Sequence, residues 1–216
     1  MNENVKEVFE WIYCIIIALV LALLFRYFIG TPTVVQQRSM YPTLKENQRL
    51  FLNRTFRITG KEPKVGDIIT FEAPSSFYTR YDANQNNPVA KYEHEFNNIF
   101  EKFIYYVIEN TKTSYIKRVI AVEGDHVEIK DNTVFVNGIE LEEDYLSEGM
   151  ITDMVQGSRD ESFFTNFTVP DNCVFAMGDN RTKSKDCRDL GCVPLDKVEG
   201  IVVLRFWPLD VFGKVK

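Results

Sequence analysis

The chain has 216 residues, an apolar fraction of 45% and a formal net charge of -6. This length accommodates one globular domain of ordinary size together with a membrane segment. The acidic charge, without any strongly basic stretch, argues against a nucleic-acid-binding protein.

The N-terminal segment is apolar over nearly the length of a membrane span. Residues 11–25 read WIYCIIIALVLALLF, and the apolar run continues past Arg26 to Ile29. With Arg26 reaching to the interface, the segment approaches the about 20 residues that a spanning helix needs. A cleavable signal peptide would begin with a basic region, whereas MNENVKEVFE holds three Glu and one Lys. We therefore expect a retained anchor over residues 1–31, whose orientation the flanking charges leave open.

The remaining residues, 32–216, read as a single β domain. Strand-like runs bounded by turn residues occupy 65–71, 115–122, 126–138, 172–177 and 200–208. Within 126–138, Asp131–Asn132 is typical of a hairpin turn. The sequence predicts a mainly β, antiparallel fold, either a sandwich or a partly closed barrel.

Residues 72–113 interrupt this strand pattern. A polar stretch precedes apolar residues at helical spacing: Tyr92, Phe96, Ile99, Phe100, Phe103 and Val107. We predict a helical insertion into the β domain. A lid over part of the core is the simpler interpretation of this insertion, and a docking surface for a partner is the alternative.

Cysteine and histidine usage limits the chemistry. The cysteines are Cys14, Cys173, Cys187 and Cys192. They form no C-x-x-C pair, so we expect no structural zinc and no metal or cofactor. Cys187 and Cys192 could pair if the backbone turns between them, although free thiols are the simpler interpretation. Any histidine base must be His94 or His126.

Three segments carry candidate catalytic residues. The first contains a serine and the second contains a lysine. In QRSMYPTL, residues 37–44, Pro42 stiffens the backbone after Ser39. In YIKRVIAV, Lys117 and Arg118 lie on a strand that is apolar on both faces. Burial disfavours a charged lysine, and a neutral lysine can act as general base toward a serine hydroxyl. Protection of an edge strand is the competing explanation for Lys117.

The third segment is MGDNRTKSKDCRDLG, residues 177–191. Its turn formers and charges are typical of a solvated loop. Together with the other two segments, it offers Asp179, Ser184, Asp186 and Arg188 to orient other groups.

In this order behind an anchor, the three segments resemble the bacterial type I signal peptidases. The serine motif is SMYPTL (39–44), the lysine motif YIKRVI (115–120) with Gly124–Asp125 after it, and the distal motif GDNR (178–181). GDIITF (66–71) and RFWP (205–208) are also similar to family segments. The resemblance covers most of the chain apart from 72–113 and about 140–168.

The resemblance implies a single-pass serine endopeptidase of the cell membrane, with its catalytic domain on the extracytoplasmic side. Its partners would be the lipid bilayer and signal-peptide-bearing precursor proteins, from which it removes the signal peptide. Ser39 would be the nucleophile and Lys117 the general base. About ten residues separate Ile29 from Ser39, so the serine would lie within about 35 Å of the bilayer.

The resemblance also implies supporting roles. Ser184 would position the lysine amine, Asp186 and Arg188 would hold the framework with Arg118, and Met40 would line the substrate cleft. At residue 37 the family usually has Gly or Ser, which in some members gives a hydroxyl to the oxyanion hole. Here the Ser39 N–H remains a donor, and the Gln37 amide is a candidate replacement.

Two other classes stay open at this point. A Ser–His–Asp hydrolase would need His126 as its base, in a strand without a recognisable partner motif. A signal-peptidase-like assembly factor or chaperone for surface proteins such as pilins, with little or no proteolysis, would be free to lose the dyad. The long 72–113 insertion also suggests a specialised member with a restricted substrate set or a dedicated partner.

Overall fold

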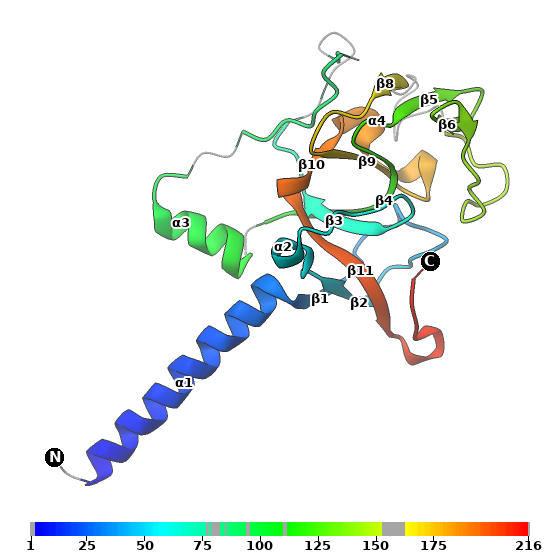
Figure 1. Cartoon of the computed structure of the whole chain (residues 1–216). Coiled ribbons are helices and arrows are strands. Elements are labelled where there is room, and N and C mark those ends of the chain that lie inside the picture. Colours follow the sequence, from blue (N-terminus) through cyan, green and yellow to red (C-terminus); the bar gives the residue numbers. More distant parts are fainter. Residues whose placement is uncertain are drawn as a thin grey trace.

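The computed structural model describes residues 3–76, 78, 83–84, 86–93, 96–109, 112–152 and 163–215. It consists of a long N-terminal helix and a domain of antiparallel strands (Figure 1). This confirms the expected fold class, a mainly β antiparallel domain behind an apolar N-terminal helix. His94 lies outside the described residues.

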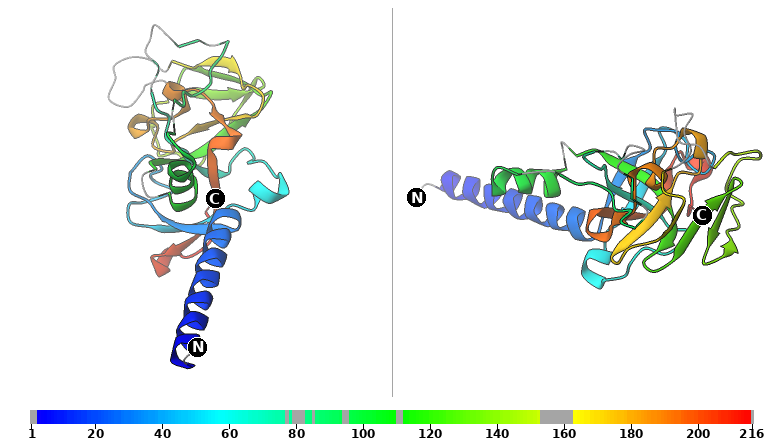
Figure 2. Two further views of the ribbon diagram at one scale, coloured as in Figure 1. Left: turned by 90° about the vertical axis from the view of Figure 1, so that its left-hand side faces the viewer. Right: turned by 90° about the horizontal axis from the view of Figure 1, so that it is seen from above.

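The N-terminal helix, α1 (Glu3–Phe28), stands away from the domain (Figure 2). Its stretch Lys6–Phe28 has 23 residues and a mean hydropathy of 2.6, and its most apolar window is not buried inside the protein. At 1.5 Å per residue this stretch extends about 35 Å, enough for the hydrocarbon core of a bilayer. By length and composition, α1 is a candidate membrane span.

The larger of two sheets has seven strands. Their order is β1 (Gly30–Val34), β2 (Arg49–Asn53), β11 (Val198–Trp207), β3 (Ile68–Glu72), β4 (Ser114–Val122), β9 (Cys173–Met177) and β10 (Val193–Pro194). The smaller sheet has the order β7 (Ile139–Glu140), β6 (Thr133–Val136), β5 (His126–Lys130) and β8 (Asn166–Thr168). Every pair of neighbouring strands is antiparallel.

Short helical segments connect the strands. They are α2 (Phe56–Thr59), α3 (Ile99–Phe103), the π-helix η1 (Ile104–Ile108), the 3-10 helices η2 (Arg181–Lys183), η3 (Leu195–Lys197) and η4 (Leu209–Val211), and α4 (Cys187–Leu190). α3 and η1 form one continuous helical stretch within the 72–113 segment.

Two hydrophobic clusters make the core. The larger one joins the sheets: Phe71 and Val119 of the large sheet pack in it with Val127 and Phe167 of the small one. The smaller cluster surrounds Met40 and Leu44 beneath the serine segment. Cys173, Cys187 and Cys192 are buried free thiols, so Cys187 and Cys192 form no disulfide in this structure.

The predicted strands are present, and the predicted hairpin turn joins β5 to β6. Asp131 and Asn132 both have positive φ, 50° and 63°, as a type I′ turn requires. The sequence analysis missed β1 and β2. Pro32 argues against a strand at β1, but β1 is an edge strand paired only with β2, where a missing N–H is tolerated.

Candidate active site

The site begins with the contact between Ser39 and Lys117. Ser39 lies in the turn that follows β1, and Lys117 lies in β4, opposite Ile69 of β3. The Lys117 amine is 2.8 Å from the Ser39 hydroxyl oxygen. Both residues are buried, with only 4% of Ser39 and 2% of Lys117 exposed. The fold therefore brings together two polar groups that are 78 residues apart in the chain.

The Lys117 amine has few polar neighbours. Besides Ser39, it donates to the Ile116 carbonyl at 2.9 Å, and it forms no ion pair with any residue in the described part of the chain. Burial lowers the pKa of Lys117 to about 8, although the Asp186 carboxylate opposes this shift. About a tenth of Lys117 is therefore neutral at pH 7, and about half at pH 8.

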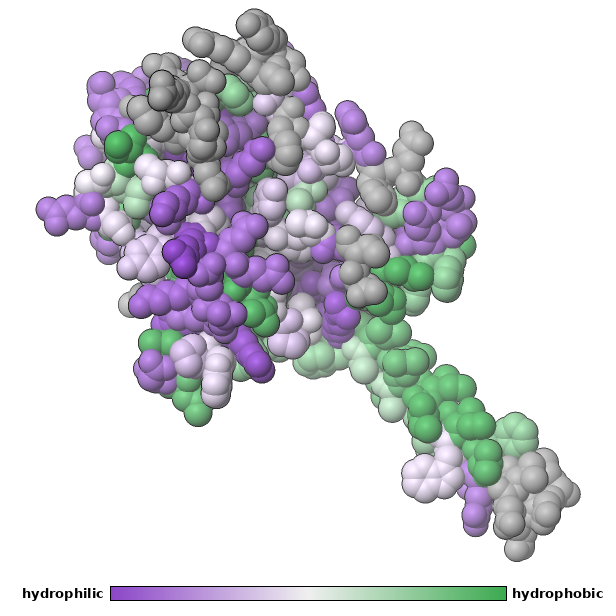
Figure 3. All heavy atoms as spheres, turned by 180° about the vertical axis from the view of Figure 1, so that it is seen from behind, coloured by the Kyte–Doolittle hydropathy of each residue, from purple (hydrophilic) through white to green (hydrophobic). Residues whose placement is uncertain are grey.

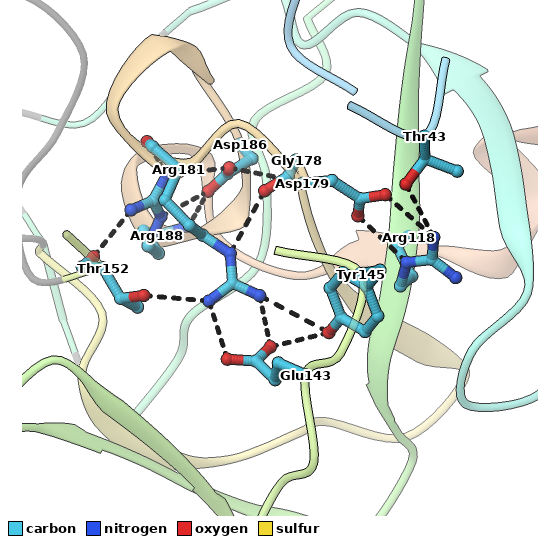
Figure 4. Close-up of polar contacts among 10 residues, drawn as sticks. All are labelled: Thr43, Arg118, Glu143, Tyr145, Thr152, Gly178, Asp179, Arg181, Asp186 and Arg188. Atoms are coloured by element: carbon cyan, nitrogen blue, oxygen red, sulfur yellow. Dashed lines mark hydrogen bonds and ion pairs between the residues drawn. The ribbon is translucent and has the colours of Figure 1, made fainter. Parts of the chain in front are cut away.

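Arg118, the adjacent cation on β4, is fully paired. Its guanidinium donates to both carboxylate oxygens of Asp179, at 2.9 and 2.8 Å (Figure 4). It also donates to the Gly66 carbonyl at 3.1 Å. It also stacks on Tyr145, with 4.1 Å to the ring centroid. Such a bidentate pair fixes the distal segment against β4.

The distal segment holds a second buried ion pair. Arg188 donates to Asp186 at 2.8 and 3.0 Å, and Asp186 accepts the Gly178 amide at 2.9 Å (Figure 4). Asp186 also caps α4 through the Arg188 amide. Burial alone would raise the pKa of Asp186, but Arg188 and these hydrogen bonds hold it below its ordinary value. The carboxylate therefore stays ionised in the interior.

A third buried arginine was missed by the sequence analysis. Arg181 donates to both Glu143 oxygens and, at 3.0 Å, to the Thr152 hydroxyl (Figure 4). The Thr152 carbonyl accepts from Arg188 at 2.6 Å, so Thr152 connects the two arginines. Arg181 belongs to the GDNR motif, but no sequence signal indicated Glu143, which lies where the family resemblance lapses.

Gly178 and Asn180 hold the serine segment in place. The Asn180 amide donates to the Ser39 carbonyl at 3.0 Å, and its side chain donates to the Arg38 carbonyl at 3.1 Å. A Cβ on Gly178 would come within 2.2 Å of the Ser184 hydroxyl and 2.5 Å of the Ser39 carbonyl oxygen. Only glycine fits this approach of the distal segment to the serine.

The structure places Ser184 and Met40 differently from what the sequence analysis predicted. Ser184 is fully buried, and its hydroxyl makes no hydrogen bond with the Lys117 amine. It lies near Asp186 and helps to lower the pKa of that carboxyl. The expectation that Met40 lines the cleft is wrong for this structure. Its side chain is fully buried in the smaller core cluster, because the turn after Ser39 directs it inward.

A cleft runs from Ser39 toward the end of α1. Its walls include Thr31–Val35 from β1 and the following residue, and Ser114–Lys117 from β4. Arg26, Arg54 and Glu109 line its far end, while Gln37 is exposed beside Ser39. The Ser39 N–H donates no hydrogen bond to any described residue. Among described residues, no group of three His, Cys, Asp or Glu could hold a metal ion.

His126 lies away from this site. It is exposed on β5 of the small sheet, where its ring contacts the Thr168 hydroxyl at 3.3 Å. No carboxylate partner orients it among the described residues. The geometry therefore gives no support to a Ser–His–Asp arrangement built on His126.

A serine beside a buried lysine is a known variant of the serine-peptidase triad. The family described as "Signal peptidase, peptidase S26" matches residues 8–207. Signal peptidase I of Bacillus licheniformis is 35% identical over 97% of this chain and 94% of that protein. Signal peptidase I T of Bacillus subtilis (strain 168) is 32% identical over 100% of this chain and 93% of that protein.

A solved structure of a signal peptidase I from Enterococcus faecalis V583 is 25% identical, with a TM-score of 0.40 over 65% of this chain and 97% of that one. From the family match and the two Bacillus relatives, the chain belongs to the signal peptidases of peptidase family S26, which are serine endopeptidases.

Replacing Gly178 by Ala tests the packing of the distal segment against the serine. The new Cβ would push against the Ser39 carbonyl oxygen, now 2.5 Å from its position, and displace the serine from the lysine. We expect Gly178→Ala to lower kcat about 100-fold while circular dichroism stays unchanged.

Gly149→Ala is the matched control, because Gly149 has positive φ but nothing lies within 4 Å of the place that a Cβ would take there. It should lose about 1–2 kcal/mol of stability, because alanine is strained at this φ, and keep its kcat. Full activity in Gly178→Ala would show that the close approach is not needed for catalysis.

Proposed function

We propose that this protein removes signal peptides from exported precursor proteins, with Ser39 as nucleophile and Lys117 as general base. The observation that carries the proposal is the 2.8 Å contact between a serine hydroxyl and a buried lysine amine that forms no ion pair with any described residue. The names of the Bacillus relatives, which are signal peptidases, support the substrate class.

The reaction is acyl transfer to water. Neutral Lys117 accepts the Ser39 proton while the serine oxygen attacks the scissile carbonyl. The resulting ammonium then gives its proton to the leaving amine as the acyl-enzyme forms. Lys117, neutral again, takes a proton from the water that attacks the acyl-enzyme, and the serine is restored.

Two donors are available for the oxyanion of the tetrahedral intermediate. The Ser39 N–H is unpaired among the described residues, and the Gln37 side chain is exposed on the cleft wall next to it. Donors placed where the negative charge develops stabilise it most strongly in a partly desolvated site. We assign Gln37 as the second donor beside the Ser39 amide.

The cleft suits an extended peptide. β1 is an edge strand, and β9 pairs with β4 only from Arg118 onward, so Ser114–Lys117 also presents a free strand edge. A peptide between these two edges could pair with either one through its main chain. Its carbonyl would then pass the Ser39 hydroxyl at the closed end of the cleft.

The anchor places this cleft at a membrane surface. Only Ile29 separates α1 from β1, so the wall of the cleft starts where α1 ends. A signal peptide is an apolar segment with small residues before its cleavage point. We propose that α1 holds the domain on the extracytoplasmic side of the cell membrane, where exported precursors emerge.

A non-proteolytic assembly factor is the less favoured function. Such a protein would be free to lose the serine or the lysine, whereas both are present here and 2.8 Å apart. The matching relatives also carry the names of peptidases.

Substitution of the dyad separates these functions. With full-length protein in detergent and a signal-bearing precursor as substrate, we expect Ser39→Ala and Lys117→Ala each to lower kcat by at least about 10³-fold. Lys45→Ala, at an exposed lysine of the same segment, should cleave at the wild-type rate. An inert wild type would favour the assembly factor, and an active Lys117→Ala would exclude the dyad.

The pH dependence follows from the pKa of about 8 for Lys117. Below this pKa the lysine is protonated and unable to accept the serine proton. We expect kcat to fall about tenfold per pH unit below pH 8 and to level off above it. Unfolding curves at each pH serve as the control for loss of structure. Similar rates at pH 5 and pH 8 in the folded protein would contradict the mechanism.

A comparison of Gln37 with Gln36 tests the assignment of Gln37 to the oxyanion hole. Gln37→Ala should lower kcat about 10²–10³-fold with little change in KM, because one oxyanion donor is lost. Gln36→Ala is the matched control, since Gln36 is also exposed and lines the same cleft. Equal kcat values for the two variants would leave Gln37 without a role in the oxyanion hole.

A further inference from the structure

The helical stretch Ile99–Ile108, made of α3 and η1, turns large apolar side chains outward. Ile99 is 87% exposed, Phe100 68% and Phe103 46%. Neither α3 nor η1 contains a buried residue, so the stretch does not close over the core as a lid. The solvent face of an isolated surface helix is normally polar. An exposed apolar face of this kind indicates a contact with another molecule or with a membrane.

This stretch lies at the domain end of α1. η1 contacts α1, and α3 projects from the domain on the side of the anchor (Figures 1 and 2). In the view of Figure 1, α3 runs crosswise to α1. Hydrophobic side chains continue from α1 onto the adjoining part of the molecule (Figure 3). A helix that crosses a membrane-spanning helix at its end lies along the membrane surface.

The other side of the stretch is fixed to the domain. Tyr105 donates to the Glu72 carboxylate at 2.9 Å. At the end of η1, Glu109 accepts from Arg26 of α1 at 3.2 Å and from Arg54 at 2.9 Å. These contacts hold the apolar side chains outward, and they place the end of η1 at the depth of Arg26.

The residues around this stretch are of the types found where proteins contact lipid headgroups. A hollow between α1, α2 and η1 is lined by Tyr27, Arg57, Lys102 and Tyr106 among others. Arg57 lies over the Tyr27 ring at 4.7 Å from its centroid. Aromatic and cationic side chains of this kind gather where a bilayer meets water.

We propose that the outer face of Ile99–Ile108 inserts into the bilayer surface and forms a second membrane contact beside α1. Interfacial helices bury their apolar face about 5–10 Å into the headgroup boundary. The proposal rests on the anchor role of α1 proposed above. A single spanning helix leaves the domain free to rotate about it, whereas two contacts fix the height and direction of the cleft.

Lipid fits this face better than a protein partner does. The three exposed apolar side chains are far fewer than the about 20–30 residues that each partner contributes to a standard protein interface. The face is also continuous with the surface of α1 that lipid would cover.

Depth-dependent quenching tests the proposal. A cysteine replaces Leu19, Phe100 or Ile139 in a Cys14→Ser background, in which the remaining cysteines are buried. Each full-length variant is labelled with an environment-sensitive dye in detergent and reconstituted into phosphatidylcholine–phosphatidylglycerol vesicles. Nitroxides attached near the headgroup or deep in the acyl chain then serve as quenchers. Ile139 is the matched control: it is 74% exposed, but on β7 of the distant small sheet.

We expect the Phe100 label to shift to the blue and to be quenched most by the shallow nitroxide. The Leu19 label should respond most to the deep nitroxide, and the Ile139 label to neither. A Phe100 label that behaves like the Ile139 label, while Leu19 is quenched, overturns the second contact and leaves the anchor intact. An unquenched Leu19 label overturns the anchor and the second contact together.

Discussion

The chemistry of this protein depends on two adjacent buried cations that have different hydrogen-bond partners. Lys117 and Arg118 are both buried on β4, and their side chains lie on opposite faces of the sheet. Arg118 meets Asp179 in a bidentate pair, while the hydrogen bonds of the Lys117 amine to described residues go only to a hydroxyl and a carbonyl. Burial without a directly bound anion favours the neutral amine of Lys117, whereas the Asp179 carboxylate compensates the charge of Arg118. One strand thereby carries both the lysine proposed as the base and a structural cation.

The ion pairs around this strand have a cost that their geometry offsets. A buried charge costs several kcal/mol to desolvate, and a pair repays this only when its remaining donors and acceptors are also satisfied. Arg188 donates to Asp186 and to the carbonyls of Arg181 and Thr152. Arg181 in turn holds Glu143 and Thr152. The result is a rigid distal segment, which is what the narrow contact between Gly178 and the Ser39 carbonyl requires.

Local pattern was sufficient to predict the strands and the burial of Lys117. Alternation and turn residues indicated β3, β4, β5, β6, β9 and β11, because each of these runs carries its own hydrophobic signal. The burial of Lys117 followed from the apolar faces of its own strand. The position of Ser39 did not follow from local pattern, since a serine before a Pro turn is ordinary, and only the family motif indicated it.

Pairing between residues far apart in the chain could not be predicted from the sequence. The pairing of Arg181 with Glu143 joins residues 38 apart, and nothing near either residue specifies the other. Met40 illustrates the reverse error, in which position within a motif suggested a cleft residue. The turn after Ser39 instead directs this side chain into the core, where Leu44 and Leu50 surround it.

Arg26 connects the N-terminal helix α1 to the cleft. The sequence suggested a side chain that merely reaches toward the interface. Instead Arg26 pairs with Glu109, and Arg54 pairs with the same carboxylate. Three segments therefore meet at one carboxylate: the end of α1, the chain after β2, and the end of η1. Because the same residues line the far end of the cleft, a change in the tilt of α1 relative to the domain would alter the space at that end.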